Sequence, residues 1–273
     1  MSQTLAIASG KGGAGKSTVT ANLGAILSKN GHRTLIIDAD IGLRAQDALL
    51  GLESRVVYDL VDLAEGECTP EQALLYSEEW NGLSLLPASQ FARAKAIDSK
   101  RLRKILDSMR VQFDFILIDC PAGLERGLRN VLGSGMDGVL LVTEPDDLSI
   151  RCAERVCQLL DQKQLDRPRL IVNRIVPDLV RQREMMSAIT ASQVLDLSLL
   201  GEIPEDPAVG RALLKHTLPI RFDCEARRAF QRIASRLEGV QTPLPGYGLD
   251  KQSFFRKHFR KSRLREVTPI DNY

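Results

Sequence analysis

The chain has 273 residues, of which 44% are hydrophobic and 26% are charged, so it is long enough for one large α/β domain with a substantial core. The net charge is +2, yet residues 250–265 contain seven Lys or Arg and one Asp, which leaves the rest of the chain at −4. This distribution argues against a protein that coats nucleic acid with its whole surface, and no specific nucleic-acid partner is expected. It favours one local contact with an anionic partner.

Cysteine spacing and hydropathy exclude several further classes of protein. The five cysteines include no CxxC pair, so neither a zinc site nor a disulfide framework is indicated, and free thiols are expected. The N-terminus lacks the features of a signal peptide. No stretch approaches the length of a membrane-spanning helix, so any membrane contact is expected to be peripheral.

Short apolar runs alternate with amphipathic stretches along the chain, a pattern typical of βαβ units with a buried parallel sheet. Seven runs are predicted to be strands: 4–8, 34–38, 83–87, 113–119, 138–143, 169–173 and 198–203. Six stretches are predicted to be helices: 16–30, 98–110, 125–134, 147–162, 178–190 and 225–237. We therefore expect a single α/β domain over residues 1–238, with a doubly wound, mostly parallel sheet flanked by helices. Residues 239–249, rich in Pro and Gly, are expected to form a flexible linker.

The first predicted strand leads into a phosphate-loop pattern, GxxxxGK[ST], formed by Gly10, Gly15, Lys16 and Ser17. Glycines allow backbone N–H groups to curl around phosphate oxygens at the start of a helix. The pattern predicts a P-loop NTPase in which Lys16 neutralises phosphates and Ser17 binds Mg²⁺. The alternative is a glycine-rich turn with an unrelated lysine. Loop geometry leaves the additional lysine, Lys11, without a local partner.

Three aspartates follow predicted strands, where ligands of open parallel sheets collect. Asp38 and Asp119 are predicted to hold the metal, and Asp40 to position the attacking water. For Asp38, a helix-capping role is the alternative.

The stretch KGGAGKST carries the extra lysine that marks the deviant Walker A ATPases, a family that includes ParA and MinD, and the chain resembles this family. Residues 36–63 resemble the MinD-type members most closely. Further similarity lies in four short stretches: 85–90, 115–123, 171–174 and 201–206.

The resemblance implies roles for individual residues. Lys11 would cross to the nucleotide of a second subunit. Together with Lys16 and Asp40, it would serve hydrolysis. Residues 120–123 would sense the γ-phosphate. The implied nucleotide site consists of Gly10, Lys11, Gly12, Gly13, Ala14, Gly15, Lys16, Ser17, Thr18, Asn173, Pro204, Glu205 and Asp206. Asn173 would contact the adenine; taken alone, it is equally typical of a turn at a strand end.

Residues 250–265 form the second informative stretch. On a helix, the phenylalanines lie within an arc of about 140° and most basic residues lie on the other side. An anionic membrane, nucleic acid and a disordered solubilising tail all suit this composition, and the resemblance favours a membrane-targeting helix. The predicted membrane residues are Phe254, Phe255, Phe259, Arg256, Lys257, Arg260 and Lys261. Residues 266–273 follow this helix, a departure from the family, and their role is left open.

Residues 146–160 resemble the MinD surface that binds the division inhibitor MinC and the activator MinE. Arg151 and Glu154 keep the chemistry of that surface, but Cys152 replaces an aspartate of the family. A solvated helix face is the alternative.

Together, these features predict an ATPase of division-site selection. ATP and Mg²⁺ would drive homodimerisation, attachment to anionic phospholipid on the inner face of the cytoplasmic membrane, and recruitment of a MinC-like inhibitor. Hydrolysis, stimulated by MinE or another topological factor, would return the protein to the cytoplasm. The alternatives are a flagellar-number or ParA-type positioning ATPase, and an ATP-binding membrane scaffold with negligible turnover.

Overall fold

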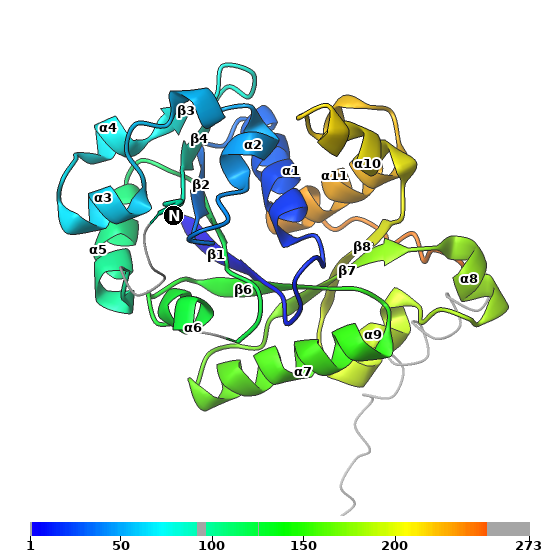
Figure 1. Cartoon of the computed structure of the whole chain (residues 1–273). Helices are drawn as coiled ribbons and strands as arrows, with labels where there is room; N and C mark the ends of the chain where they lie inside the picture. The colour runs from blue at the N-terminus through cyan, green and yellow to red at the C-terminus, as the bar shows by residue number, and fades with distance from the viewer. Residues whose placement is uncertain (1, 92–96, 125, 250–273) are drawn as a thin grey trace, which may run out of the picture.

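The computed structural model describes residues 2–91, 97–124 and 126–249, and within them eight strands form one sheet (Figure 1). The strands are β1 (Gln3–Ala8), β2 (Thr34–Asp38), β3 (Leu75–Tyr76), β4 (Leu83–Leu86), β5 (Phe115–Asp119), β6 (Gly138–Thr143), β7 (Arg169–Ile175) and β8 (Leu199–Pro204). Their order is β3-β4-β2-β5-β1-β6-β7-β8. All neighbouring pairs are parallel except β3 and β4. The expected doubly wound, mostly parallel sheet is confirmed.

Eleven α-helices lie in the described ranges: α1 (Lys16–Lys29), α2 (Gln46–Leu50), α3 (Leu60–Glu65), α4 (Pro70–Ala73), α5 (Ser99–Met109), α6 (Arg126–Leu132), α7 (Asp147–Gln162), α8 (Pro177–Gln182), α9 (Ala188–Leu195), α10 (Pro207–Leu214) and α11 (Glu225–Leu237). Two 3₁₀ turns, Glu53–Arg55 and Pro219–Arg221, complete the connections. None of these helices combines the length and apolarity needed to cross a bilayer.

The sheet separates two hydrophobic cores because successive side chains of a strand point to opposite faces. In β1, Leu5 and Ile7 pack with α1 and α11, whereas Ala6 and Ala8 pack with α5, α6, α7 and α9. Both faces are therefore covered (Figure 1). This explains why the strands read as continuous apolar runs rather than as alternating ones.

The strand pairing brings the carboxyl ends of three strands together. Ile7 of β1 and Asp38 of β2 both lie opposite Asp119 of β5. The glycine-rich loop directly follows β1. This loop and both aspartates therefore lie together at the carboxyl-terminal ends of the central strands.

The structure differs from the sequence prediction in several elements of the chain's first 238 residues. Four short helices, α2, α3, α4 and α10, are not among the predicted ones, because segments of four to eight residues are too short to show a clear helical period. The stretch predicted as one helix over 178–190 forms two, α8 and α9, because Arg183 adopts φ +62° and ends α8. The short strand β3, only two residues long, lacked a detectable apolar run.

Residues 239–249, expected to be a flexible linker, instead lie against the domain. The buried carboxylate of Glu202 in β8 accepts a hydrogen bond from the backbone N–H of Gly246 at 2.5 Å. The guanidinium of Arg236 donates to the carbonyl oxygen of Thr242 at 2.8 and 3.1 Å. We call residues 240–249 the strap. The predicted tail elements, 250–265 and 266–273, lie outside the described residues.

Candidate nucleotide-binding site

The phosphate loop connects β1 to α1, as the sequence predicts, and close packing explains two of its glycines. Gly15 has φ +93°, and a Cβ built on it would lie 2.3 Å from Nδ2 of Asn173. A Cβ on Gly10 would lie 2.1 Å from the carbonyl oxygen of Cys152 in α7. Any side chain at either position would displace a neighbour. Lys16, the first residue of α1, is 6% exposed, so its ammonium group belongs to the interior of the loop.

Asp38 and Asp119 form a buried pair of carboxyl groups beside this loop. Both side chains are fully buried and occupy opposite positions of β2 and β5. Burial, reinforced by the charge of Asp119, raises the pKa of Asp38 to about 7. Burial also raises the pKa of Asp119, against the hydrogen bond that this group accepts from Gln46. Two acids held together in this way favour a nearby positive charge.

Asp38 organises the backbone that follows β2. Its Oδ1 accepts the N–H of Asp40 at 3.0 Å, and its Oδ2 accepts the N–H groups of Ala45 and Gln46 at 2.9 and 3.0 Å. These contacts hold the turn that leads into α2, although the N-cap residue of that helix is Ala45 and not Asp38. A role in metal binding stays a prediction for this residue.

Asp40 lies at the edge of the site. It is half-buried, and burial raises its pKa while the charge of Lys16 opposes the rise. The charge of Lys16 thus favours the ionised form of Asp40. Its role in positioning water stays a prediction.

The residues predicted to hold Mg²⁺ fit such an ion. Mg²⁺ prefers oxygen ligands and keeps several of its waters, so one hydroxyl, one carboxylate and phosphate oxygens suffice. Oδ1 of Asp119 is buried and has no hydrogen-bond partner in the described ranges, an arrangement that a hydrated cation would satisfy. Ser17 lies beside it, since Gln46 Nε2 donates both to the Ser17 carbonyl oxygen and to Asp119. No group of three His, Cys, Asp or Glu side chains in these ranges makes an alternative metal site.

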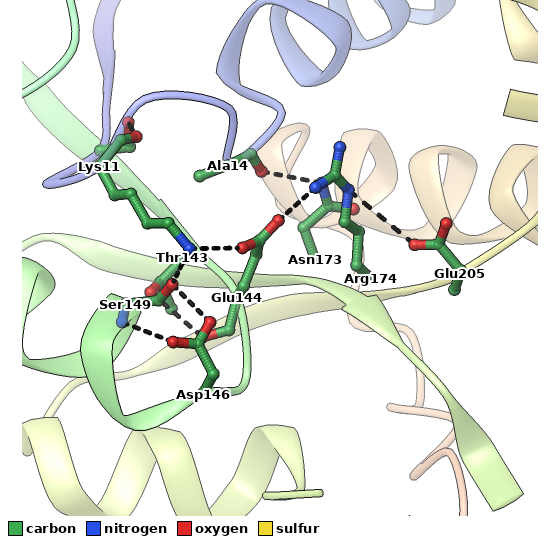
Figure 2. Close-up of polar contacts among 10 residues, drawn as sticks. Lys11, Ala14, Thr143, Glu144, Asp146, Ser149, Asn173, Arg174 and Glu205 are labelled. Atoms are coloured by element: carbon green, nitrogen blue, oxygen red, sulfur yellow. Dashed lines mark hydrogen bonds and ion pairs between the residues drawn. The ribbon is translucent and has the colours of Figure 1, made fainter. Parts of the chain in front are cut away.

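The expectation that Lys11 lacks a local partner is wrong. Its ammonium group lies 3.3 Å from Oε2 of Glu144, directly after β6, and 3.4 Å from Oγ of Ser149 in α7 (Figure 2). The Lys11 side chain is 37% exposed and that of Glu144 is 13% exposed. Lys11 is thus neutralised within its own chain, on the rim of the loop, while Lys16 lies inside it.

The contacts of Glu144 continue to the region predicted to bind the base. Its other oxygen, Oε1, lies 2.5 Å from Nη1 of Arg174, whose Nε lies 3.9 Å from Glu205 (Figure 2). Next to Arg174, the amide of Asn173 donates from Nδ2 to the carbonyl oxygen of Ala14 at 2.9 Å. Strand pairing places Ile175 opposite Pro204, so the predicted base-binding residues of β7 and β8 do lie side by side.

The predicted partner surface lies on α7. Arg151 and Glu154 are both exposed, and a partner role for them stays a prediction. Cys152, between them, packs against the phosphate loop at Gly10. All five cysteines are free thiols, as expected.

Two residues of the site were missed from the sequence. Glu144 follows a predicted strand, so the rule that selected Asp38 and Asp119 would have found it as well. Gln46 carried no signal, because a glutamine in a polar stretch is ordinarily exposed. Its burial depends on the tertiary structure.

Comparisons with known proteins agree with this geometry. Residues 5–220 match the model of the CobQ/CobB/MinD/ParA nucleotide-binding domain. The chain is 38% identical over 270 residues to the putative septum site-determining protein MinD of Guillardia theta, covering 96% of this chain and 97% of that one. It is 39% identical over 248 residues to MinD of Bacillus subtilis (strain 168), covering 89% and 92%.

Solved structures give the same result. A MinC:MinD complex of Aquifex aeolicus matches with a TM-score of 0.82 and 37% identity, covering 91% of this chain and 100% of that one. MinD of Pyrococcus horikoshii complexed with Mg-ADP matches with a TM-score of 0.77 and 30% identity, covering 87% and 96%. These similarities agree with the phosphate loop, the paired aspartates and the sheet topology. The chain therefore belongs to the CobQ/CobB/MinD/ParA nucleotide-binding family, and within it resembles the MinD proteins.

Proposed function

We propose that this protein is a MinD-like ATPase of division-site selection, which cycles between cytoplasm and membrane. ATP and Mg²⁺ bind at the phosphate loop and promote homodimerisation; the dimer attaches to the inner face of the cytoplasmic membrane and holds a MinC-like inhibitor there. Hydrolysis to ADP and phosphate releases it. ATP hydrolysis is the activity expected of the family, and the cycle on the membrane is part of this proposal.

The observation that carries this proposal is the separation of the two loop lysines. Lys16 is buried in the loop, whereas Lys11 is on the rim, partly exposed and paired with a carboxylate instead of a phosphate. The loop glycines Gly12 and Gly13 are exposed as well. A lysine in this position is free to exchange Glu144 for an anion on a second subunit, which supports a nucleotide-dependent dimer.

The site residues support in-line attack of water on the γ-phosphate. Lys16 and loop N–H groups would stabilise the charge on the phosphate oxygens, and Asp40 would orient the water. Ser17 and Asp119 would hold Mg²⁺, which neutralises phosphate charge when bound. Asn173 and the backbone of Pro204–Asp206 would hold the base, with Asn173 exchanging its contact with Ala14 for the adenine.

The amphipathic sequence of residues 250–265 supports attachment to anionic phospholipid. Each basic residue contributes about 1 kcal/mol near such a surface, so one copy with three phenylalanines binds weakly. Two copies on a dimer bind more strongly through effective concentration. Nucleotide-dependent dimerisation thereby becomes a membrane switch.

A MinC-like inhibitor is the partner that the similarity to the MinC:MinD complex supports. The exposed side chains of Arg151 and Glu154 on α7 are the proposed contact surface. MinE or another topological factor would stimulate hydrolysis from the same region.

Co-sedimentation with phosphatidylglycerol-containing vesicles tests the cycle. The intact chain should pellet with ATP and Mg²⁺ but not with ADP, because only the dimer presents two tails. A chain ending at Asp250 should remain soluble in both nucleotides, although it should still dimerise with ATP. Vesicles of phosphatidylcholine alone are the control, since they lack the negative charge.

Equal pelleting of the intact chain in ATP and ADP would show that the switch is wrong. Phosphate release, measured with and without vesicles, separates the ATPase from a membrane scaffold that binds ATP with negligible turnover.

A further inference from the structure

One buried side chain of the site has no role assigned by the motifs: Gln46, the first residue of α2. It is fully buried, although glutamine is among the residue types that usually face solvent. It lies in the segment that follows Asp38 and Asp40, and its side chain reaches both the phosphate loop and β5.

A single nitrogen atom makes both of these contacts. Nε2 of Gln46 donates to Oδ2 of Asp119 at 2.7 Å and to the carbonyl oxygen of Ser17 at 3.1 Å. Both partners accept hydrogen bonds and neither donates, so the orientation of the amide is fixed by its surroundings. Gln46 therefore ties the carboxylate of β5 to the residue predicted to bind the metal.

The same amide leaves two buried oxygen atoms without partners. In the part of the chain that the structure describes, neither Oδ1 of Asp119 nor Oε1 of Gln46 accepts a hydrogen bond. Buried acceptors are rarely left in this state, because the lost hydration costs about 1–3 kcal/mol for each. The waters around a bound Mg²⁺ are suitable donors for both atoms.

We propose that Gln46 is a positioning residue for Mg²⁺: it holds one oxygen of Asp119 so that the other faces the hydrated ion, and its own carbonyl oxygen accepts from the same water shell. This inference rests on the proposed nucleotide function. A neutral donor suits this place, because a carboxylate there would add a third acid to the buried pair of Asp38 and Asp119.

The backbone of Gln46 extends this role to the loop that bears Asp40. Its N–H donates to Oδ2 of Asp38, while Oδ1 of Asp38 holds the N–H of Asp40. The ordering of Asp119 around the ion and the placement of Asp40 thus depend on the same residue.

The test is the Mg²⁺ dependence of nucleotide binding by the full chain, followed with a fluorescent ATP analogue. Gln46→Met keeps the length of the side chain and removes its donor. Without Mg²⁺, in EDTA, the nucleotide affinity of the variant should stay within about twofold of wild type. The Mg²⁺ concentration that gives half of the metal-dependent increase in nucleotide affinity should rise about tenfold, as for other residues that support metal ligands. Electron paramagnetic resonance of Mn²⁺ bound with ADP should show an altered environment of the ion.

Two further variants complete the experiment. Gln193→Met, on the exposed face of α9, makes the same chemical change away from the site and should leave the Mg²⁺ dependence unchanged. Gln46→Asn keeps the amide on a shorter side chain and should show a smaller shift than Gln46→Met; it also replaces that variant if the methionine prevents folding.

The outcomes separate the two proposals. Wild-type Mg²⁺ dependence in a folded Gln46 variant, with nucleotide still bound, overturns the role of Gln46 and leaves the nucleotide function intact. Failure of the wild-type chain to bind ATP overturns the proposed function itself.

Discussion

At the scale of single residues, the two lysines of the phosphate loop differ in their surroundings more than in their chemistry. Lys16 is 6% exposed, while Lys11 is partly exposed and lies between Glu144 and Ser149. The pair is only partly buried, and at 3.3 Å with one partly exposed partner it is expected to contribute no more than about 1 kcal/mol, so it can be broken at little cost. In the proposed dimer, Glu144 would compete with the second subunit for Lys11 without preventing dimerisation.

We expect Lys11→Ala to bind ATP with wild-type affinity within about threefold, because an exposed lysine adds little to a loop already charged by Lys16. The variant should nevertheless remain monomeric with ATP and Mg²⁺, since it lacks the group proposed to cross the interface. Sedimentation velocity with a non-hydrolysable ATP analogue measures this. An ATP-dependent dimer of the variant would return Lys11 to a role within its own chain.

Glu144→Gln should have the opposite effect. In the proposed dimer, the Lys11–Glu144 pair of each subunit has to open. If each pair contributes ~0.5 kcal/mol, its removal from both subunits should strengthen ATP-dependent dimerisation about fivefold. Arg174 keeps a second acid, Glu205, in the variant. Glu67→Gln, which removes an exposed charge elsewhere, is the matched control. An unchanged dimer affinity would mean that Glu144 does not hold Lys11 back.

At the scale of elements, the strap is held by β8 and α11. Besides the contacts of Glu202 and Arg236, the hydroxyl of Tyr247 accepts a hydrogen bond from Nη2 of Arg232 at 2.6 Å and lies 3.2 Å from Glu225. Burial raises the pKa of Glu202, while its hydrogen bonds with the strap oppose the rise. The strap thus fixes where residue 249 lies on the domain, and with it the point from which the tail continues.

We expect Glu202→Leu to release the strap, because the Gly246 N–H loses its acceptor and Arg232 and Arg236 lose a nearby negative charge. Hydrogen exchange of residues 240–249 should then become at least about tenfold faster. Glu202→Gln keeps the acceptor and should retain most of the protection. Wild-type exchange rates in Glu202→Leu would show that other contacts hold the strap.

At the scale of the whole molecule, the buried acids of the site lower its stability in the absence of ligand. Burial raises the pKa of Asp38 from its ordinary value of 3.8 to about 7 in the folded chain. Between these values the folded state keeps a proton that the unfolded state has lost, so the free energy of unfolding falls as the pH rises from about 4 to about 7. A bound cation would remove this penalty, which links folding to ligand binding.

We expect Asp38→Asn to be less stable than wild type, because one acceptor is lost, and to lack this pH dependence. The stability gap between the two should be larger at about pH 5 than at about pH 8, by about 2–3 kcal/mol, in urea unfolding with EDTA and without nucleotide. Asp114→Asn is the control: a hydrogen bond from Arg33 lowers the pKa of Asp114 to about 2, so its gap should stay constant over this range. A constant gap for Asp38→Asn would contradict the assignment.

Local sequence patterns were enough to predict the seven longer strands, the phosphate loop and the aspartates at the strand ends. It did so because these features are local: apolar runs specify buried strands, and consecutive glycines followed by Lys16 and Ser17 specify a phosphate-binding turn. The family followed from the same stretches. The functions of the tail and of Arg151 and Glu154 stay predictions.

The partners of these residues, in contrast, depend on how the chain folds in three dimensions. Glu144 meets Lys11, Gln46 meets Asp119, and Glu202 holds Gly246, although each pair is separated by 44 to 133 positions in the chain. Such contacts depend on strand order and register, which no local pattern encodes. Spacing alone therefore left Lys11 without a partner and the strap free, whereas the folded sheet gives both of them carboxylates to bind.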